Sequence, residues 1–275
     1  MKKTTPLISV VMPFYNAAAF LDESIQSILK QTFRDFELIL INDASSDNSD
    51  EVVQKYLSDT RVRYICNDTR TGIVVNLNRG VSAAKAELIA RMDGDDISQP
   101  ERFQRQYDYM SAHKDIALLG SYVEIIDENG VPLQISKKPT EHEDIKKVCF
   151  YYGPFVHPVV MFRKSVVENV GGYRGQYELT EDIDLFFRII YEGYRTANLP
   201  EVLLKYRQHG GSTSRRSKEI GRKSFRLKKE IVKKYKIRLS LKEHLSMYIH
   251  YMLDMTLTGE QKRRLQLLIK GLIDR

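Results

Sequence analysis

The segment Leu88-Ile89-Ala90-Arg91-Met92-Asp93-Gly94-Asp95-Asp96 joins a short apolar run to three carboxylates within four residues. Side chains two residues apart on an extended segment point the same way, so Asp93 and Asp95 can face one site. Carboxylate oxygens suit Mn²⁺ or Mg²⁺, which completes its shell with water and substrate phosphates. The alternative is a solvated acidic turn, since Asp and Gly are ordinary turn residues. The ends of the other strands decide between the two.

Upstream of this segment, the sequence predicts strands and helices in strict alternation. Apolar, β-branched runs predict strands at 7–12, 36–41, 62–65 and 88–90, and helical spacing predicts helices at 17–30, 50–57 and from after 72 to about 85. Such alternation predicts an α/β fold with a mostly parallel central sheet and helices on both faces.

Ligands of such sheets bind outside the carboxyl ends of the strands. Here those ends carry Asn16, Asp43, Asp68 and the Asp93 cluster. The first turn, Pro13-Phe14-Tyr15-Asn16, lacks the glycine cradle that binds dinucleotides or triphosphates. The sequence therefore predicts that a phosphate ligand is held through a metal, while acidic side chains hydrogen-bond a base or a ribose.

The middle of the chain is read less easily. A helix is expected after Pro100 and a strand at 117–126, followed by an irregular stretch at 131–150 and a strand-like run at 155–163. His157 lies in that run and is interpreted as a packed or hydrogen-bonded structural residue in preference to a catalyst. Residues 171–173, Gly171-Gly172-Tyr173, mark a tight turn.

Thr180-Glu181-Asp182 opens a predicted helix with Thr180 as its N-cap. Its acids either favour the helix dipole or include a general base. A last strand is expected at 202–206. Arg207 and His209 then precede a Gly-Gly loop, which either closes over a diphosphate or is an ordinary exposed loop.

Charge divides the chain into an acidic body and a basic tail. Residues 1–200 hold 23 Lys and Arg against 29 Asp and Glu, whereas 201–275 hold 20 against 7, for a net charge of +7. The asymmetry points to a polyanionic surface, either membrane or nucleic acid. Two distant cysteines, Cys66 and Cys149, are expected to be free thiols of a reducing compartment. The N-terminus has no signal-peptide pattern, and a cytoplasmic protein is expected.

The tail predicts amphipathic helices. Residues 215–238 carry twelve basic and two acidic residues, and a second helix is expected to begin with a Ser240 and Glu243 capping box. The expected apolar stripes are Ile220, Leu227, Ile231 and Tyr235; Leu241, Leu245, Tyr248, Ile249 and Met252; and Leu265, Leu268, Ile269 and Leu272. These helices either pack on the domain or a second subunit, as in a homodimer, or rest on anionic lipid.

Together these pieces resemble family 2 glycosyltransferases of the GT-A fold, especially bacterial enzymes that assemble capsule or O-antigen. The resemblance covers about 7–214, so 1–214 is the expected catalytic domain and 215–275 a helical extension. The motifs that carry it are Val10-Val11-Met12-Pro13-Phe14-Tyr15-Asn16, Ile41-Asn42-Asp43-Ala44-Ser45-Ser46-Asp47, Asn78-Arg79-Gly80, Met92-Asp93-Gly94-Asp95-Asp96, Glu181-Asp182 and Tyr206-Arg207-Gln208-His209.

The resemblance implies an inverting, metal-dependent transfer from a nucleotide-sugar, with a UDP-sugar expected, to a glycan acceptor that is expected to be lipid-linked. Asp182 is the implied catalytic base, and Asp95 the implied ligand of Mn²⁺ or Mg²⁺, with Asp96 also a candidate and His209 a further one. The implied donor-binding residues are Pro13, Tyr15, Asn16, Asp43, Asp68, Arg79, Asp93 and Arg207. The implied acceptor region holds His157, Gly172, Tyr173 and Glu181. The implied location is the cytoplasmic face of the membrane, with 215–275 on anionic lipid and no nucleic-acid partner.

Two other functions are weighed. A sugar nucleotidyltransferase would need a Gly-rich loop with a basic residue near the N-terminus, which 13–16 does not provide. A non-enzymatic polyanion-binding module would leave Asp43, Asp93, Asp95 and Asp182 unexplained at the ligand-binding edge of the sheet.

Overall fold

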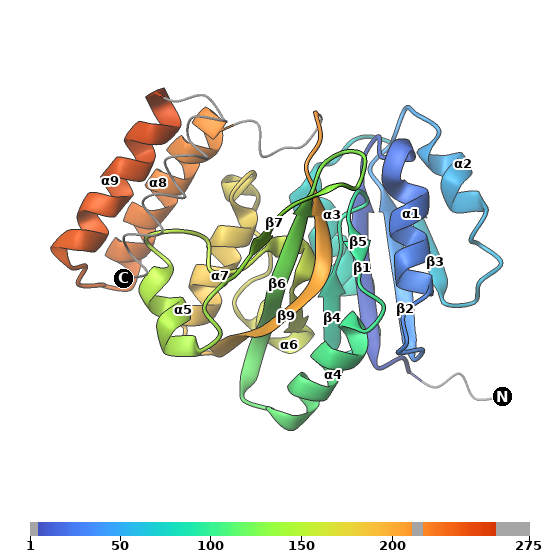
Figure 1. Cartoon of the computed structure of the whole chain (residues 1–275), viewed down its shortest axis with the longest axis horizontal. Coiled ribbons are helices and arrows are strands. Elements are labelled where there is room, and N and C mark those ends of the chain that lie inside the picture. The colour runs from blue at the N-terminus through green and yellow to red at the C-terminus, as the bar shows by residue number, and fades with distance from the viewer. Residues whose placement is uncertain (1–4, 211–216, 257–275) are drawn as a thin grey trace.

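The computed structural model describes residues 5–210 and 217–256. These residues form a nine-stranded sheet in the order β3-β2-β1-β4-β8-β6-β9-β5, with β7 paired to β6 beside that path. Helices cover both faces, and two long helices stand at one end of the molecule (Figure 1). The fold is therefore of the predicted α/β class, with a helical C-terminal extension.

The N-terminal half of the sheet is parallel, as predicted. β1 (Ile8–Phe14) lies between β2 (Phe36–Asn42) and β4 (Leu88–Arg91), and β3 (Val62–Cys66) forms the edge beside β2. Every residue of β1, β2 and β4 is buried, because helices cover both faces, and their sequences are accordingly almost continuously apolar. The carboxyl ends of these four strands meet at one edge.

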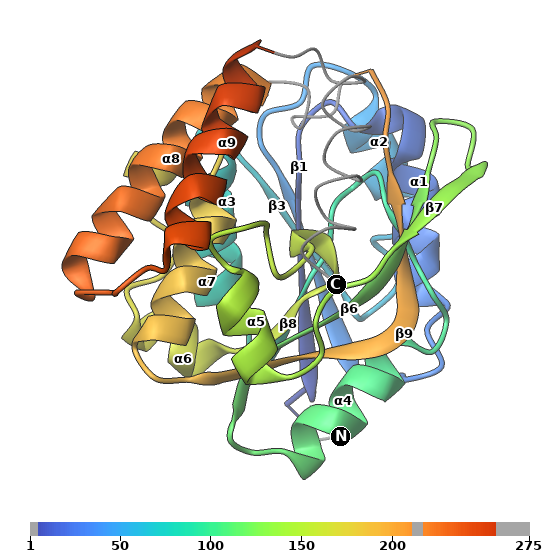
Figure 2. The same ribbon diagram turned by 60° about the vertical axis from the view of Figure 1, so that its left-hand side comes forward.

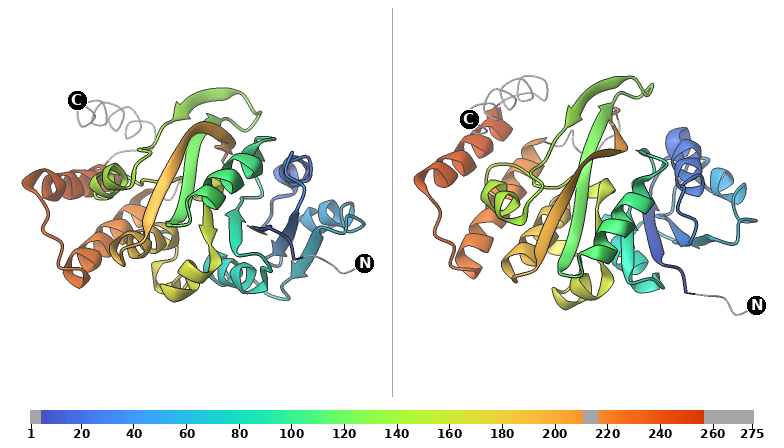
Figure 3. Two further views of the ribbon diagram at one scale, coloured as in Figure 1. Left: turned by 90° about the horizontal axis from the view of Figure 1, so that it is seen from below. Right: turned by 60° about the horizontal axis from the view of Figure 1, so that its bottom comes forward.

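The helices form two layers, seen from two further directions in Figures 2 and 3. Three pack on one face of the sheet, namely α1 (Ala18–Leu29), α2 (Ser49–Gln54) and α4 (Arg102–Ala112). Four pack on the other, namely α3 (Ile73–Ala83), α5 (His142–Val148), α6 (Lys164–Asn169) and α7 (Glu181–Tyr191). Gly80 lets α3 approach β1 closely, since an added Cβ would lie 2.2 Å from Val11 Cγ1.

The second half of the sheet is mixed. β8 (Met161–Arg163) pairs antiparallel with β4 and β6 (Ile116–Ile126), and β9 (Arg195–Arg207) runs parallel to β6. The remaining strands, β5 (Ile97–Ser98) and β7 (Pro132–Ser136), are antiparallel to β9 and β6. The strand expected at 202–206 is thus the end of a longer one, and the irregular stretch 131–150 holds β7 and α5.

One predicted strand is largely wrong. Only the last three residues of 155–163 form a strand: a 3-10 turn, η1 (His157–Val159), precedes the three residues of β8. Pro158 explains the turn, because its fixed φ and missing N–H fit the first turn of a helix and not a paired strand. Cys66 and Cys149 are free thiols, as predicted, with Cys66 exposed and Cys149 buried.

The extension contains α8 (Ser217–Lys234) and α9 (Leu241–Thr256). The predicted capping box at the start of α9 is confirmed: Glu243 N donates to Ser240 Oγ at 3.2 Å, and Ser240 N donates to Glu243 Oε2 at 2.7 Å. The third expected helix, around 265–272, lies outside the described residues. Within the two described ranges, we find no helix with the length and apolarity to cross a membrane.

Candidate active site

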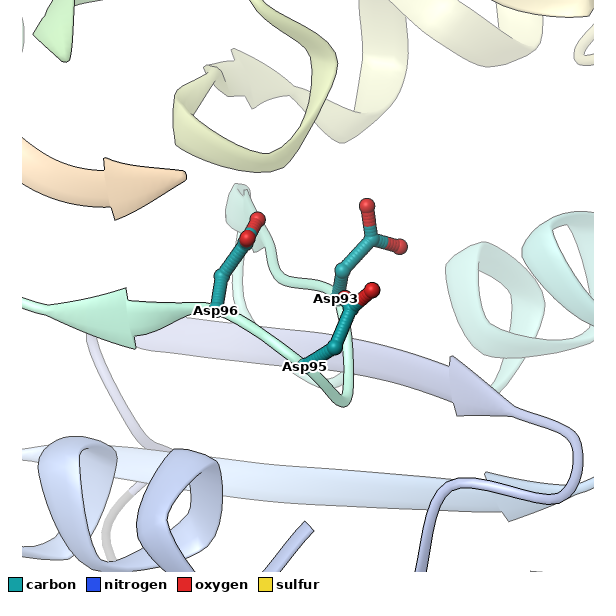
Figure 4. Close-up of side chains that lie close together, drawn as sticks. All are labelled: Asp93, Asp95 and Asp96. Atoms are coloured by element: carbon teal, nitrogen blue, oxygen red, sulfur yellow. The ribbon is translucent and has the colours of Figure 1, made fainter. Parts of the chain in front are cut away.

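Three carboxylates gather in the loop after β4, at the carboxyl edge of the parallel strands. Oxygens of Asp93, Asp95 and Asp96 all lie within 4.8 Å of one another, and the three side chains leave the loop on the same side (Figure 4). Asp95 Oδ2 also lies 2.9 Å from Nε2 of His209, two residues after the end of β9. The structure therefore brings together the residues predicted to hold a metal.

Asp96 is the least satisfied member of this cluster. Its side chain is fully buried, Oδ1 accepts a 2.8 Å hydrogen bond from the backbone N–H of Arg207, and Oδ2 has no partner among the described residues. Burial raises the pKa of Asp96 well above its usual value, and the charges of Asp95 and Asp93 raise it further. A buried carboxylate oxygen without a donor fits a divalent cation, since hard oxygen ligands suit Mn²⁺ and Mg²⁺.

Two buried arginines that the sequence analysis did not single out support the loop. Arg91, the last residue of β4, forms an ion pair with Asp93. Arg102 of α4 donates from Nη2 to the backbone oxygen of Arg91 at 2.8 Å, and burial lowers the pKa of Arg102 to about 9. A basic residue closing a buried strand just before an acidic motif was the available signal for Arg91.

Arg207 has a different environment from the predicted one. Its guanidinium is buried, with Nε donating to Asp95 O at 2.8 Å, Nη1 to Glu128 O at 3.0 Å, and Nη2 paired with Glu23 Oε2 at 2.5 Å. These contacts fix the acidic loop to the end of β9. Direct contact with a diphosphate stays a prediction, and it would require some of these bonds to open.

Asp43 forms a second cluster, after β2. It accepts hydrogen bonds from Thr71 N at 2.8 Å, Thr71 Oγ1 and Asn67 Nδ2 at 3.0 Å, and Gly72 N at 3.0 Å. Burial alone would raise the pKa of Asp43, but these hydrogen bonds outweigh it and lower the pKa to about 2. Arg79 of α3 donates to Asn67 Oδ1 in the same network.

The remaining predicted donor residues line the same edge. Asn16, in the left-handed region with φ 49°, accepts from Ser46 N at 2.8 Å. Tyr15 is 39% exposed, and Arg70 lies 4.0 Å above its ring. Asp68 is exposed after β3, whereas Pro13 is buried within β1. Tyr15 and Asp68 are thus open to a ligand, while Pro13 and Asn16 shape the turn.

Glu181 and Asp182 begin α7. Asp182 Oδ1 accepts from the Ile183 N–H at 2.7 Å, and burial raises the pKa of Asp182 above its usual value. Burial also raises the pKa of Glu181 to about 7, with the Asp182 charge adding to the rise, and Glu181 Oε2 has no partner in the part of the chain that the structure describes. Burial raises the pKa of Asp93, and the negative charge of Asp182 adds to the rise, so the two predicted functional segments lie near each other. Thr180 is the N-cap by position, but its side chain bonds Tyr177 O instead of capping.

Residues of the predicted acceptor region are held in place by hydrogen bonds and close packing. His157 Nε2 lies 2.9 Å from the Tyr173 hydroxyl, and burial lowers the pKa of His157 well below its usual value. Gly172 has φ 64°, and an added Cβ would lie 2.8 Å from Asn78 Oδ1. Asn78 exchanges hydrogen bonds with the Tyr173 backbone at 2.8 and 2.9 Å. The structural interpretation of His157 therefore agrees with its contacts.

The parallel half-sheet with an acidic loop at its carboxyl edge defines the GT-A class of α/β proteins. The chain belongs to glycosyl transferase family 2, which it matches over residues 9–171, and it is a glycosyltransferase.

Relatives of known name agree with this assignment. The chain is 37% identical over 215 residues to the O-antigen biosynthesis glycosyltransferase WbnJ of Escherichia coli, covering 76% of this chain and 82% of WbnJ. It is 31% identical over 219 residues to the UDP-Gal:alpha-D-GlcNAc-diphosphoundecaprenol beta-1,3-galactosyltransferase of E. coli, covering 78% and 79%.

Solved structures share the fold at low identity. S. aureus TarS 1-349 in complex with UDP has a TM-score of 0.66 and 16% identity, covering 94% of this chain and 77% of TarS 1-349. Mannosyltransferase PcManGT from Pyrobaculum calidifontis, in complex with GDP-Man and Mn²⁺, has a TM-score of 0.63 and 15% identity, covering 98% and 76%.

Proposed function

We propose that this glycosyltransferase moves a sugar from a UDP-sugar to a hydroxyl of a lipid-linked glycan, with inversion at the anomeric carbon, in the synthesis of a surface polysaccharide such as capsule or the O-antigen of lipopolysaccharide. The observation that carries the proposal is the carboxylate cluster of Asp93, Asp95 and Asp96 at the carboxyl edge of the sheet, with Asp182 facing the same region. The names of the two E. coli relatives support the polysaccharide and the lipid-linked acceptor.

Asp95 and Asp96, with His209, would hold Mn²⁺ or Mg²⁺, and Asp93 would contact the ribose. When bound, the ion neutralises the charge of the leaving diphosphate. Arg207 keeps the loop in place through its bonds to Asp95 O and Asp96 Oδ1. Asp43 and Asp68 would bind the base, with Tyr15 beside them, and Arg79 would act through Asn67.

Asp182 accepts the proton of the acceptor hydroxyl. The acceptor oxygen forms its bond to the anomeric carbon while the bond from that carbon to the diphosphate breaks, and the electron pair leaves with the diphosphate. The backbone N–H of Ile183 fixes the orientation of Asp182, and a raised pKa makes a carboxylate a better base near neutral pH. Attack from the face opposite the leaving group inverts the configuration.

The test is a panel of nucleotide-sugars incubated with the full chain and Mn²⁺ or Mg²⁺, scored for release of the nucleoside diphosphate. Metal-dependent turnover of a UDP-sugar is the expected result. Turnover that is unchanged in the presence of a chelator would refute the metal requirement, and retention of anomeric configuration in the product would refute the single displacement.

A further inference from the structure

The two helices of the extension differ in where their apolar residues lie. α8 buries Leu227 and Ile231 in the cluster that packs on the domain, and Met247 of α9 joins the same cluster. The other large apolar residues of α9 are exposed: Leu241 by 85%, Leu245 by 58%, Tyr248 by 52%, Ile249 by 37% and Met252 by 55%. We call these five residues the α9 stripe.

The α9 stripe holds a large share of the exposed apolar side chains. Across the residues that the structure describes, twelve large hydrophobic side chains are exposed, and five of them belong to this stripe. Their spacing of three and four residues places them along one side of the helix. Contiguous exposed apolar surface marks an interaction site in a soluble chain.

A basic face of α8 borders the stripe. Tyr248 of the stripe packs on Phe225 of α8 with ring centroids 5.1 Å apart. Arg222 and Lys229 lie three and four residues on either side of Phe225, so they share its side of the helix, and Lys233 continues that side. All three basic side chains are exposed. Apolar and basic surfaces therefore meet at the Phe225–Tyr248 contact.

We propose that this combined surface rests on an anionic lipid bilayer, with the α9 stripe in the boundary between headgroups and acyl chains and the basic face of α8 against the phosphates. Interfacial helices have this arrangement of an apolar face bordered by Lys and Arg. The inference rests on the proposed function, because a lipid-linked acceptor is presented at a bilayer. A second copy of the chain fits less well, since docking by the same stripe would bring two basic faces together.

The surface is tied to the acceptor side of the active site. Tyr177 OH donates to Glu230 of α8 at 2.6 Å, and Lys223 Nζ donates to Glu178 O at 3.0 Å. Residues 177 and 178 precede Asp182 by five and four positions. A bilayer bound to α8 and α9 therefore has a short, hydrogen-bonded connection to the segment that carries the catalytic base.

The absence of tryptophan from the sequence permits a clean reporter. Tyr248→Trp in the full chain places one indole in the stripe, and Leu57→Trp, at a residue 40% exposed outside it, is the matched control. With vesicles of phosphatidylglycerol and phosphatidylcholine, the emission of the first variant should shift to the blue and that of the second should not. Equal behaviour of the two variants would overturn the proposal.

Charge is tested separately by co-sedimentation with the same vesicles. The triple change Arg222→Gln, Lys229→Gln and Lys233→Gln should weaken binding by about 100-fold, since each charge near the headgroups contributes about fivefold. The matched control, the triple change Lys30→Gln, Lys55→Gln and Lys114→Gln at exposed positions outside α8 and α9, should bind as the unaltered chain does. Binding to pure phosphatidylcholine should be weak, and binding to anionic vesicles should fall with salt. Binding that ignores lipid charge and salt contradicts the proposal.

Two further outcomes are distinguishable. A blue shift of Tyr248→Trp that grows with protein concentration without vesicles, together with a dimer in sedimentation velocity, would assign the stripe to a subunit interface and overturn the lipid assignment. Turnover of a UDP-sugar on a detergent-solubilised acceptor reports on the proposed function alone. Normal turnover without vesicle binding would refute only the docking surface, whereas vesicle binding without turnover would refute only the proposed function.

Discussion

Asp43 and Asp96 are both buried carboxylates at the same edge of the sheet, but their surroundings are opposite. Asp43 accepts four hydrogen bonds, and these lower its pKa to about 2. Within residues 5–210 and 217–256, the Asp96 side chain accepts one hydrogen bond, leaves Oδ2 without a partner, and has a raised pKa. Glu181 resembles Asp96, with a buried oxygen that has no partner in the same ranges. The carboxylate of Asp43 thus has its hydrogen-bond donors, whereas that of Asp96 lacks some of them.

The difference separates two kinds of role. A carboxylate that already has its donors organises its own loop, and here Asp43 holds the turn at Thr71 and Gly72. A carboxylate buried without donors costs free energy unless a cation or a proton supplies what is missing. We therefore expect metal binding and proton transfer to concentrate around Asp95, Asp96, Glu181 and Asp182.

The largest expected effect is that of Asp182→Asn. Transfer should fall by about 10²–10⁴-fold, the usual contribution of a positioned base, while UDP binding is retained. The measurement is steady-state transfer together with calorimetric titration of UDP. Asp115→Asn, at an exposed position, is the control. Near-normal turnover of Asp182→Asn would show that Asp182 only stabilises the first turn of α7.

The next effect concerns the metal. Asp95→Ala should weaken UDP binding in the presence of metal by about 100-fold or more. Loss of even an outer partner of a metal ligand lowers metal affinity by about 10–100-fold. UDP is titrated with and without Mn²⁺, and Asp108→Ala serves as the exposed control. Circular dichroism should show an intact fold. An unchanged response to Mn²⁺ would move the metal away from this loop.

The third prediction uses the raised pKa of Glu181. Because its pKa in the folded protein, about 7, exceeds its ordinary value of 4.5, its contribution to the free energy of unfolding is fully present below about pH 4.5 and is lost as the pH rises through 7. The free energy of unfolding of the parent should therefore fall by roughly 2–3 kcal/mol between pH 5 and pH 8, and Glu181→Gln should remove this fall. Urea unfolding at both pH values measures it. Parallel pH profiles of variant and parent would show that Glu181 titrates normally.

The smallest expected effect concerns Asp43, the carboxylate that already has its hydrogen-bond donors. Asp43→Asn should lower the free energy of unfolding at pH 7 by roughly 2 kcal/mol, since a depressed pKa stabilises the ionised form. That stability is present above about pH 4 and is lost as the pH falls towards 2, so the variant and the parent should converge there. Asp96→Asn, in the absence of metal, should not destabilise the protein. If both variants lose stability equally, the contrast between the two carboxylates is wrong.

The sequence predicted the parallel half well because its signals are local. Buried strands read as apolar runs, and each ends in a polar turn that the next helix follows. The supports of the acidic loop were not predictable in this way: Arg207 meets the loop from a segment 112 residues away, and Arg102 donates back to Arg91 from α4. Pro158 turned an apparent strand into a 3-10 turn, and the spacing of α9 showed an apolar side without showing that this side faces outward.

The bond from Arg207 N to Asp96 Oδ1 joins residues 111 positions apart, and the pair of Arg207 with Glu23 spans 184. Contacts of such sequence separation are closed late in folding, because the chain entropy of a long loop must be lost before they form. During synthesis, β1 to β4 can therefore assemble before β9 leaves the ribosome, but the acidic loop cannot. The enzyme acquires its fold progressively and the geometry of its acidic loop only near the end.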